Sequence, residues 1–375
     1  QYNNANSDIE INSESELSLQ TDGTTRLFIK DSGIGIGTTN PSTIHHIHNS
    51  GATQGWTHYT NSSTGTSGDD GTHVGTNGLH AYIWNREAGQ IYFGTSATAR
   101  MIIDDNSRIS LSNNDGGSNT NTIFGYLAGN VYGSSNTNNT VIGHESHRFA
   151  SHADADKNTL VGYRVMYVGG NQADNSASNN VGVGYQALHV CSTGGYNNAV
   201  GSQALDSLTT GTENQAMGVG ALGGLTTQGS NIAIGGYAGT GGSGNLKRSI
   251  AIGHASLNST AGNDILGAVA IGYDALTAVT SGGGNTAIGY LNSSAITTGT
   301  QNTSVGMSAN NQSTGSDNTT LGYQSNFYNV TGGNNVAIGS QSMQGASGES
   351  NSNNSAVGYK SLYSVSTGGN NVAVG

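Results

Sequence analysis

From residue 121 onward, apolar and small residues recur in one short pattern, Asn-x-Ala-Ile/Val-Gly-Tyr-x-Ala/Ser-Leu, which occurs fifteen times. Its most constant member is a glycine, found at Gly125, Gly143, Gly162, Gly184, Gly201, Gly218, Gly235, Gly253, Gly272, Gly289, Gly306, Gly322, Gly339, Gly358 and Gly375. Successive glycines are 16 to 22 residues apart, and half of these spacings are 17. A nearly constant period with one apolar segment per period is typical of a β-solenoid or β-roll.

The apolar segment of each repeat has the pattern of a short strand. The residue before the glycine is always apolar, and β-branched residues fill twelve of the fifteen positions two residues earlier. Between them lies a small residue, which is alanine in nine copies. Because β-branched residues suit strands and alternate side chains point to opposite faces, we expect a strand with one large and one small face. We expect the small face, with alanines such as Ala287 and Ala337, to approach another chain closely.

Asparagine lies four residues before the glycine in thirteen of the fifteen copies. Asparagine tolerates left-handed backbone conformations, and in stacked coils its side-chain amides can form a ladder. Between the motifs lie polar segments such as Thr297-Thr298-Gly299-Thr300, which predict turns. Fourteen steps of about 4.8 Å predict a rod of roughly 65–70 Å. A coil of about 17 residues encloses few side chains, so we expect association along the rod to supply further burial.

Composition excludes several other classes of protein. The 375 residues include 60 glycines but one proline, which excludes collagen. Only 9% of residues are charged and the net charge is -11, which disfavours nucleic-acid binding. Lys247-Arg248 is the densest basic spot, the single cysteine is Cys191, and no apolar run approaches the length of a membrane span. The sequence starts at Gln1 without methionine and ends within a repeat, so we expect it to be a piece of a longer product.

The residues before the repeats predict smaller β-modules. We expect residues 1–42 to form a short β-module at a fibre joint, residues 43–116 a small β-domain, and residues 117–375 the repeat rod. Within the second part, Ile83-Trp84 and Ile91-Tyr92-Phe93 predict the two strands of a small hairpin.

These motifs resemble those of bacteriophage tail fibres. The fifteen repeats also resemble the head repeats of trimeric autotransporter adhesins, which form parallel β-rolls around a three-fold axis. The segment Arg26–Ser42, which contains Gly33-Ile34-Gly35-Ile36-Gly37, resembles a module common in tail-fibre proteins, and residues 100–111 resemble a degraded second copy. Residues 81–95 resemble the insert that such fibres often carry.

The resemblance implies an elongated, all-β homotrimer that is a structural part of the virion. It would be a rigid spacer that positions a host receptor-binding tip. Its partners would be other tail or fibre proteins and, through the distal tip, a glycan or protein of the host surface. It implies neither nucleic-acid binding nor membrane insertion. The alternative is a bacterial trimeric surface adhesin of similar architecture.

The candidate metal site is His45-His46-Ile47-His48. His46 and His48 lie on one side of a strand, and three such pairs in a trimer could surround a metal ion, because imidazole suits zinc, iron or nickel. The other interpretation, which we favour, is that these histidines are polar or interfacial residues of a β-domain. We therefore expect no metal, no cofactor and no catalytic residue.

The carboxylate pairs predict solvated turns rather than an enzyme. Asp69-Asp70 and Asp104-Asp105 are neighbours that point to opposite faces of a strand, and Asp154-Ala155-Asp156 lies in a polar segment between repeats. A polysaccharide depolymerase would need clustered acids in a groove. The Gly-x-Gly stretches precede no helix pattern, so they predict no phosphate-binding loop. An ice-binding solenoid would need a column of Thr-x-Thr, which the repeat strand lacks.

Tyrosine follows the fixed glycine in seven copies, Tyr126, Tyr163, Tyr185, Tyr273, Tyr290, Tyr323 and Tyr359. A stripe of tyrosines could bind glycans by ring stacking. It could equally pack between neighbouring coils or chains with its hydroxyls in water, and we favour this second interpretation.

Overall fold

The structure is a computed structural model that describes residues 16–21, 24–30, 33–49, 54–103, 109–111, 120–130, 136–149, 155–168, 176–241, 246–258 and 265–375. Within these residues every regular element is a β-strand, and there is no helix. The chain divides into two compact units, residues 1–110 and 111–375. The predicted all-β class is therefore confirmed.

The first sheet has four strands in the order β1-β2-β3-β4. They are β1 (Glu16–Thr21), β2 (Thr24–Lys30), β3 (Gly33–Ile36) and β4 (His45–Ile47). The first three are antiparallel, and β4 runs parallel to β3. The boundary expected after residue 42 falls between β3 and β4 of this sheet.

Two three-stranded sheets follow. One consists of β5 (Gln54–Tyr59), β6 (Thr72–Asn77) and β7 (His80–Asn85), and the other of β8 (Ile91–Thr95), β9 (Thr98–Ile103) and β10 (Ile109–Leu111). The predicted strands at Ile83-Trp84 and 91–93 are thus present, but the predicted hairpin between them is wrong. β7 pairs with β6 and β8 with β9, because two-residue turns with positive φ, at Gly78 (58°) and at Ser96 and Ala97 (52° and 58°), join those strands.

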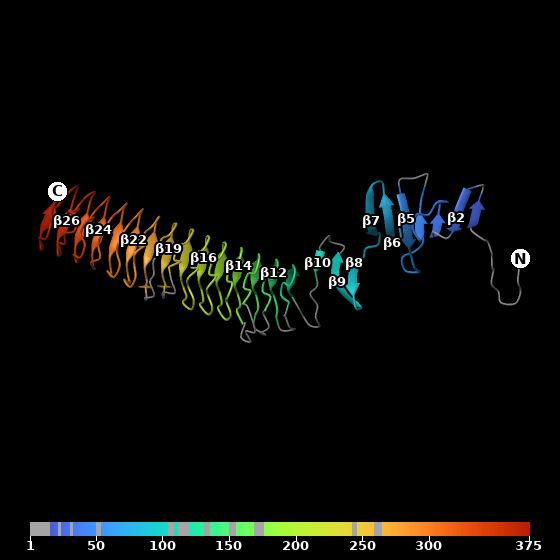
Figure 1. Cartoon of the computed structure of the whole chain (residues 1–375), viewed down its shortest axis with the longest axis horizontal. Helices are drawn as coiled ribbons and strands as arrows, with labels where there is room; N and C mark the ends of the chain where they lie inside the picture. The colour runs from blue at the N-terminus through green and yellow to red at the C-terminus, as the bar shows by residue number, and fades with distance from the viewer. Residues whose placement is uncertain are drawn as a thin grey trace. The chain divides into compact units, whose positions relative to one another are not determined.

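The second unit is a parallel β-solenoid, as the repeats predict (Figure 1). One fifteen-stranded sheet joins one strand from each coil in chain order, and the three strand positions of every repeat align with those of the next. The strands are β11 (Thr122–Phe124), β12 (Thr140–Ile142), β13 (Thr159–Val161), β14 (Val181–Val183), β15 (Asn198–Val200), β16 (Gln215–Met217), β17 (Ile232–Ile234), β19 (Ile250–Ile252), β21 (Val269–Ile271), β22 (Thr286–Ile288), β23 (Thr303–Val305), β24 (Thr319–Leu321), β25 (Val336–Ile338), β26 (Ser355–Val357) and β27 (Val372–Val374). Between them, β18 (Leu246–Lys247) and β20 (Ile265–Leu266) form a separate two-stranded parallel sheet. The boundary expected after residue 116 lies outside the described residues.

The two faces of the repeat strand are oriented opposite to our expectation. The middle, small residue points into the coil: Ala199, Ala233, Ala287 and Ala337 are fully buried. The large residues on either side point outward. The interior of a coil is narrow, so alanine fits at the strand while leucines of the following turn, such as Leu205, fill the remaining space. The small face therefore closes the coil and does not face another chain.

The expected asparagine ladder is present inside the coils. Oδ1 of Asn180 accepts hydrogen bonds from the backbone N of Asn197 (2.9 Å) and from its Nδ2 (3.1 Å). Nδ2 of Asn197 also donates to the carbonyl of Gly211 at 2.9 Å. Where Ser249 replaces asparagine, its hydroxyl still accepts a bond from the backbone N of Ala268 at 3.1 Å. The Asn180 and Asn197 amides of this ladder are thus paired, as burial of polar groups requires.

The fixed glycines are required for two reasons. All fifteen have φ between 125° and 146°, which side-chain-bearing residues rarely adopt. Neighbouring coils also approach closely: a Cβ on Gly218 would lie 2.4 Å from the carbonyl oxygen of Gly235. In the turn after the glycine, residues other than glycine also adopt the left-handed backbone conformation, for example Gln203 (φ 57°) and Leu205 (φ 53°). The backbone N of Gln203 donates to the carbonyl of Tyr185 in the previous coil at 2.8 Å, and that of Leu205 donates to the carbonyl of Ala221 in the next coil at 3.0 Å. These hydrogen bonds offset the backbone strain.

The interior of the solenoid is mainly apolar in the coils up to Ile296 and partly polar in the coils that follow. From Ala128 to Ile296 the buried residues form one hydrophobic cluster, and a second cluster includes Ala337, Met343 and Ala356. Between the two, buried polar residues fill the coils: Asn302, Ser304, Asn310, Ser313, Asn318, Thr320, Ser325, Asn326 and Asn329. Hydrogen bonds across the interior, such as Asn326 Nδ2 to Asn310 Oδ1 at 2.8 Å, replace part of the apolar packing there.

Candidate association surface of the solenoid

The outer face of the fifteen-stranded sheet is apolar and open to solvent. It carries the large residue that precedes each fixed glycine, and none of these is buried: Phe124, Ile142, Val161, Val183, Val200, Met217, Ile234, Ile252, Ile271, Ile288, Val305, Leu321, Ile338, Val357 and Val374. Met217 is 55% exposed and Ile288 37%. Because each strand lies in register with the next, these side chains form one continuous column along the sheet. We call this column, with the β-branched column two residues earlier, the outer face.

The outer face carries no charged side chain. Its second column is Val or Ile at six positions, Thr at six, and Asn198, Gln215 and Ser355 at the other three, so the apolar character lies mainly in the first column. Asn198 and Gln215 form an amide pair across β15 and β16. Soluble monomeric proteins rarely expose apolar patches of more than a few hundred Å². The first column of the outer face therefore has the chemical character expected of an association surface.

A ladder of rings borders the outer face, at the position after the fixed glycine. Tyr126, His144, Tyr163 and Tyr185 follow one another in successive coils, with ring centroids 5.2, 5.5 and 5.4 Å apart. A second run begins at Tyr237, which lies two residues after Gly235, and continues with His254, Tyr273 and Tyr290, with separations of 6.0, 5.4 and 5.5 Å. Packing between neighbouring coils, the interpretation we favoured for the tyrosines, is confirmed for these runs. His144 and His254 occupy the same column as the tyrosines but were not predicted to do so. Each directly follows a fixed glycine, which would have identified it from the sequence.

No protein-family model, no curated protein and no solved structure matches this chain. Within the described residues, no helix has the length and apolar character needed to cross a membrane. The surface itself is therefore the basis for any functional conclusion.

A charged cluster lies beside the first ring ladder. The Glu145 carboxylate is almost buried and accepts hydrogen bonds from Arg148 and, at 2.6 Å, from Nε of Arg164. The bond from Arg164 lowers the pKa of Glu145, and the pKa of Arg164 is raised in turn. The Arg164 guanidinium also lies 4.7 Å from the ring centroid of Tyr167. Because Arg164 follows Glu145 by one coil, this cluster joins two neighbouring coils.

The histidines near the N-terminus lie on and beside β4. The rings of His46 and His48 are 6.2 Å apart, and Nδ1 of His46 accepts a hydrogen bond from the backbone N of Ser42 at 3.3 Å. Among the described residues, no group of three His, Cys, Asp or Glu side chains is arranged to hold a metal ion. A shared site of three His46–His48 pairs would need three chains, so the expectation that no metal is bound stays a prediction.

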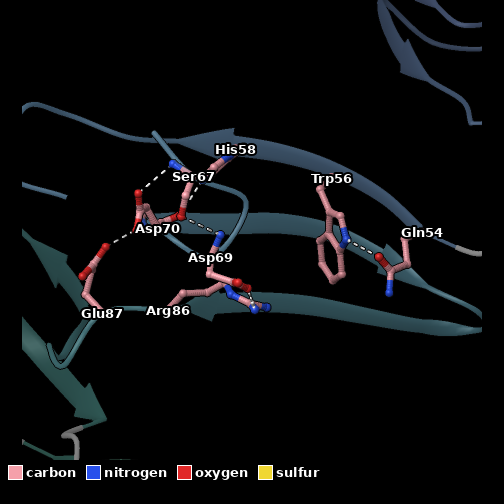
Figure 2. A network of polar contacts seen from close by, with 9 residues as sticks. Gln54, Trp56, His58, Ser67, Asp69, Asp70, Arg86 and Glu87 are labelled. Carbon is pink, nitrogen blue, oxygen red and sulfur yellow. Dashed lines mark hydrogen bonds and ion pairs between the residues drawn. The ribbon is translucent and has the colours of Figure 1, made fainter. Parts of the chain in front are cut away.

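The neighbouring carboxylates of Asp69 and Asp70 each contact a different partner (Figure 2). Asp69 forms an ion pair with Arg86, while Oδ2 of Asp70 accepts a hydrogen bond from the backbone N of Ser67 at 2.7 Å. Asp156 accepts from the backbone N of Thr137 at 2.6 Å, which links two coils. Asp104, Asp105 and Asp154 lie outside the described residues.

The other residues singled out in the sequence have structural positions. Gly33-Ile34-Gly35-Ile36 is strand β3, and Val181-Gly182-Val183 is strand β14. Burial raises the pKa of the Cys191 thiol to about 12, so the thiol is not a nucleophile. Lys247 and Arg248 line a small pocket together with Thr227, Gln228, Gly229, Ser230 and Leu266.

Proposed function

We propose that this chain is a structural segment of a bacteriophage tail fibre, a rigid spacer made of three parallel chains. In this role it holds a host receptor-binding tip away from the virion and carries out no catalysis. Its partners are two further copies of itself, other tail or fibre proteins, and a host-surface glycan or protein through the tip.

The observation that carries the proposal is the outer face. An apolar, uncharged column that runs along fifteen coils is far larger than a soluble monomer tolerates. Parallel chains that share an axis remove this column from water and place identical residues at equal heights. Three-fold closure rests on the resemblance of the repeats to trimeric fibres, because an apolar face alone also allows a dimer.

The interior of the coils supports the same conclusion. Within each coil the strand contributes mainly alanine, and the C-terminal coils have a partly polar interior. The apolar burial available to one chain is therefore modest, and association along the outer face adds to it.

Sedimentation equilibrium of the full chain tests the assembly. We expect a mass near three times the chain mass of 38.0 kDa, with no detectable monomer of the parent chain down to the lowest concentration measured. A stable, soluble, folded monomer would refute the spacer made of three chains.

Immunogold electron microscopy separates the proposed function from the bacterial adhesin. Antibodies raised against the chain should label the tail fibres of phage particles produced by the organism that encodes it. Labelling of the bacterial surface in the absence of particles would instead favour the adhesin.

A further inference from the structure

The three-stranded sheet of β5, β6 and β7 has one face covered with aromatic and histidine rings. The register places Trp56, Gly75 and Tyr82 side by side, and likewise His58, His73 and Trp84. Alternate residues of a strand share a face, so all six lie on the same side of the sheet, which we call the aromatic face. Figure 2 shows Trp56 and His58 on β5, with Gln54 beside the indole.

The rings of the aromatic face hold one another in place but stay accessible. Tyr82 packs edge-on against Trp56 at 5.7 Å, across the position where Gly75 has no side chain, and lies stacked 6.1 Å from Trp84. Oε1 of Gln54 accepts a hydrogen bond from Nε1 of Trp56 at 3.3 Å. Trp84 is nevertheless 45% exposed. Pre-ordered, exposed rings lose little conformational entropy when a ligand binds.

A buried polar group lies within the same face. His73 is only 7% exposed, and its ring lies 4.2 Å from His58 and 5.8 Å from Trp56. Nε2 of His73 has no hydrogen-bond partner in the described part of the chain. A buried polar atom without a partner destabilises the folded chain. A ligand hydroxyl that reached this nitrogen would remove this destabilisation.

The charged side chains beside the face already have polar partners within the chain. The Arg86 guanidinium lies 4.7 Å from the ring centroid of Trp84 and forms an ion pair with Asp69. Glu87 Oε1 accepts a hydrogen bond from the backbone N of Gly71 at 2.7 Å. The face itself thus offers ring surfaces and neutral hydrogen-bonding groups, and the charged side chains beside it, Arg86 with the carboxylates of Asp69, Asp70 and Glu87, are acidic in sum.

We propose that the aromatic face binds a neutral carbohydrate. A pyranose ring presents an apolar C–H side that packs on aromatic rings, and hydroxyls that bond to groups such as histidine and amide side chains. A nucleic acid or an acidic polymer would require unpaired cationic groups. The opposite face carries Thr57, Val74 and Ile83, and its one ring in these three strands is that of Tyr59 at the end of β5. The binding site is formed by one sheet of one chain, so it does not depend on the spacer function.

Tryptophan fluorescence gives a direct test, because the two tryptophans of the chain, Trp56 and Trp84, both lie on the aromatic face. The full chain is titrated separately with maltohexaose, cellohexaose, mannohexaose and chitohexaose. We expect at least one of these to shift or quench the emission saturably and to protect it from acrylamide. No response to any of the four would overturn the proposal.

Variants distinguish binding at this face from a general effect. Tyr82→Ala keeps both tryptophans and should weaken the apparent affinity at least about fivefold, whereas Tyr82→Phe should retain it. Ile83→Ala, on the opposite face, is the matched control and should bind like the parent chain. Equal affinity of Tyr82→Ala and the parent would overturn the proposal. So would emission that acrylamide cannot quench in the free protein, since a second copy of the chain would then cover the face.

Discussion

Replacing Ile288 by aspartate tests whether the outer face is the association surface. Ile288 lies on β22 and is 37% exposed in the single chain. Complete burial of an isoleucine contributes about 1.5–3 kcal/mol, so the exposed third contributes about 0.5–1 kcal/mol per chain on association, or about 2–3 kcal/mol per trimer. An unpaired carboxylate costs several kcal/mol when buried, on the order of 10 kcal/mol for three chains.

The same substitution should leave the coil itself folded. In the separate chain the aspartate is solvated, so the cost to the strand is at most about 1 kcal/mol. We therefore expect Ile288→Asp to give a folded chain, judged by circular dichroism, whose sedimentation shows a large shift from assembly to monomer. Thr298→Asp is the matched control, since it adds the same charge at an exposed turn of the same coil and should sediment like the parent chain.

The neighbouring residue should behave in the opposite way. Ala287 is fully buried inside the coil, so Ala287→Leu overpacks the interior and should lower the free energy of unfolding by about 1–3 kcal/mol without selectively dissociating folded chains. If Ile288→Asp stayed assembled while Ala287→Leu gave folded monomers, the assignment of the two faces would be wrong.

Three other changes test the interior of the solenoid. Gly235→Ala should lower the free energy of unfolding by at least about 2–3 kcal/mol, because φ is 130° and the new Cβ would lie 2.7 Å from the Gly253 carbonyl, whereas Gly236→Ala should cost little. Burial lowers the pKa of His147 from 6.5 to about 3. As the pH falls below about 6.5, this histidine is protonated in the unfolded chain but not in the folded chain, so the free energy of unfolding should fall by about 1.4 kcal/mol per pH unit. His147→Leu should remove this slope in urea titrations at several pH values. Thr320 is buried and its hydroxyl has no partner within the described residues, so Thr320→Val should raise the unfolding free energy by about 1 kcal/mol in the same assay.

The local sequence was sufficient to predict the repeat architecture. A glycine every 16 to 22 residues, a three-residue strand before it and an asparagine four residues before it each follow from the backbone chemistry of one coil. Successive coils have the same residue pattern, so they adopt the same local backbone conformation and make the same contacts, such as the hydrogen bond between Asn180 and Asn197.

Only the tertiary structure decided which way the strand faces. Period-two alternation defines two faces but not which of them points inward. That choice depends on the width of the coil, which is set by left-handed residues in the turn, such as Leu205, and by the leucines that fill the interior. The same holds for the small sheets, where the strand at Ile83-Trp84 was predictable but its partner was not. Turn geometry joined it to β6, and this pairing brought Trp56, His73 and Tyr82 onto one face.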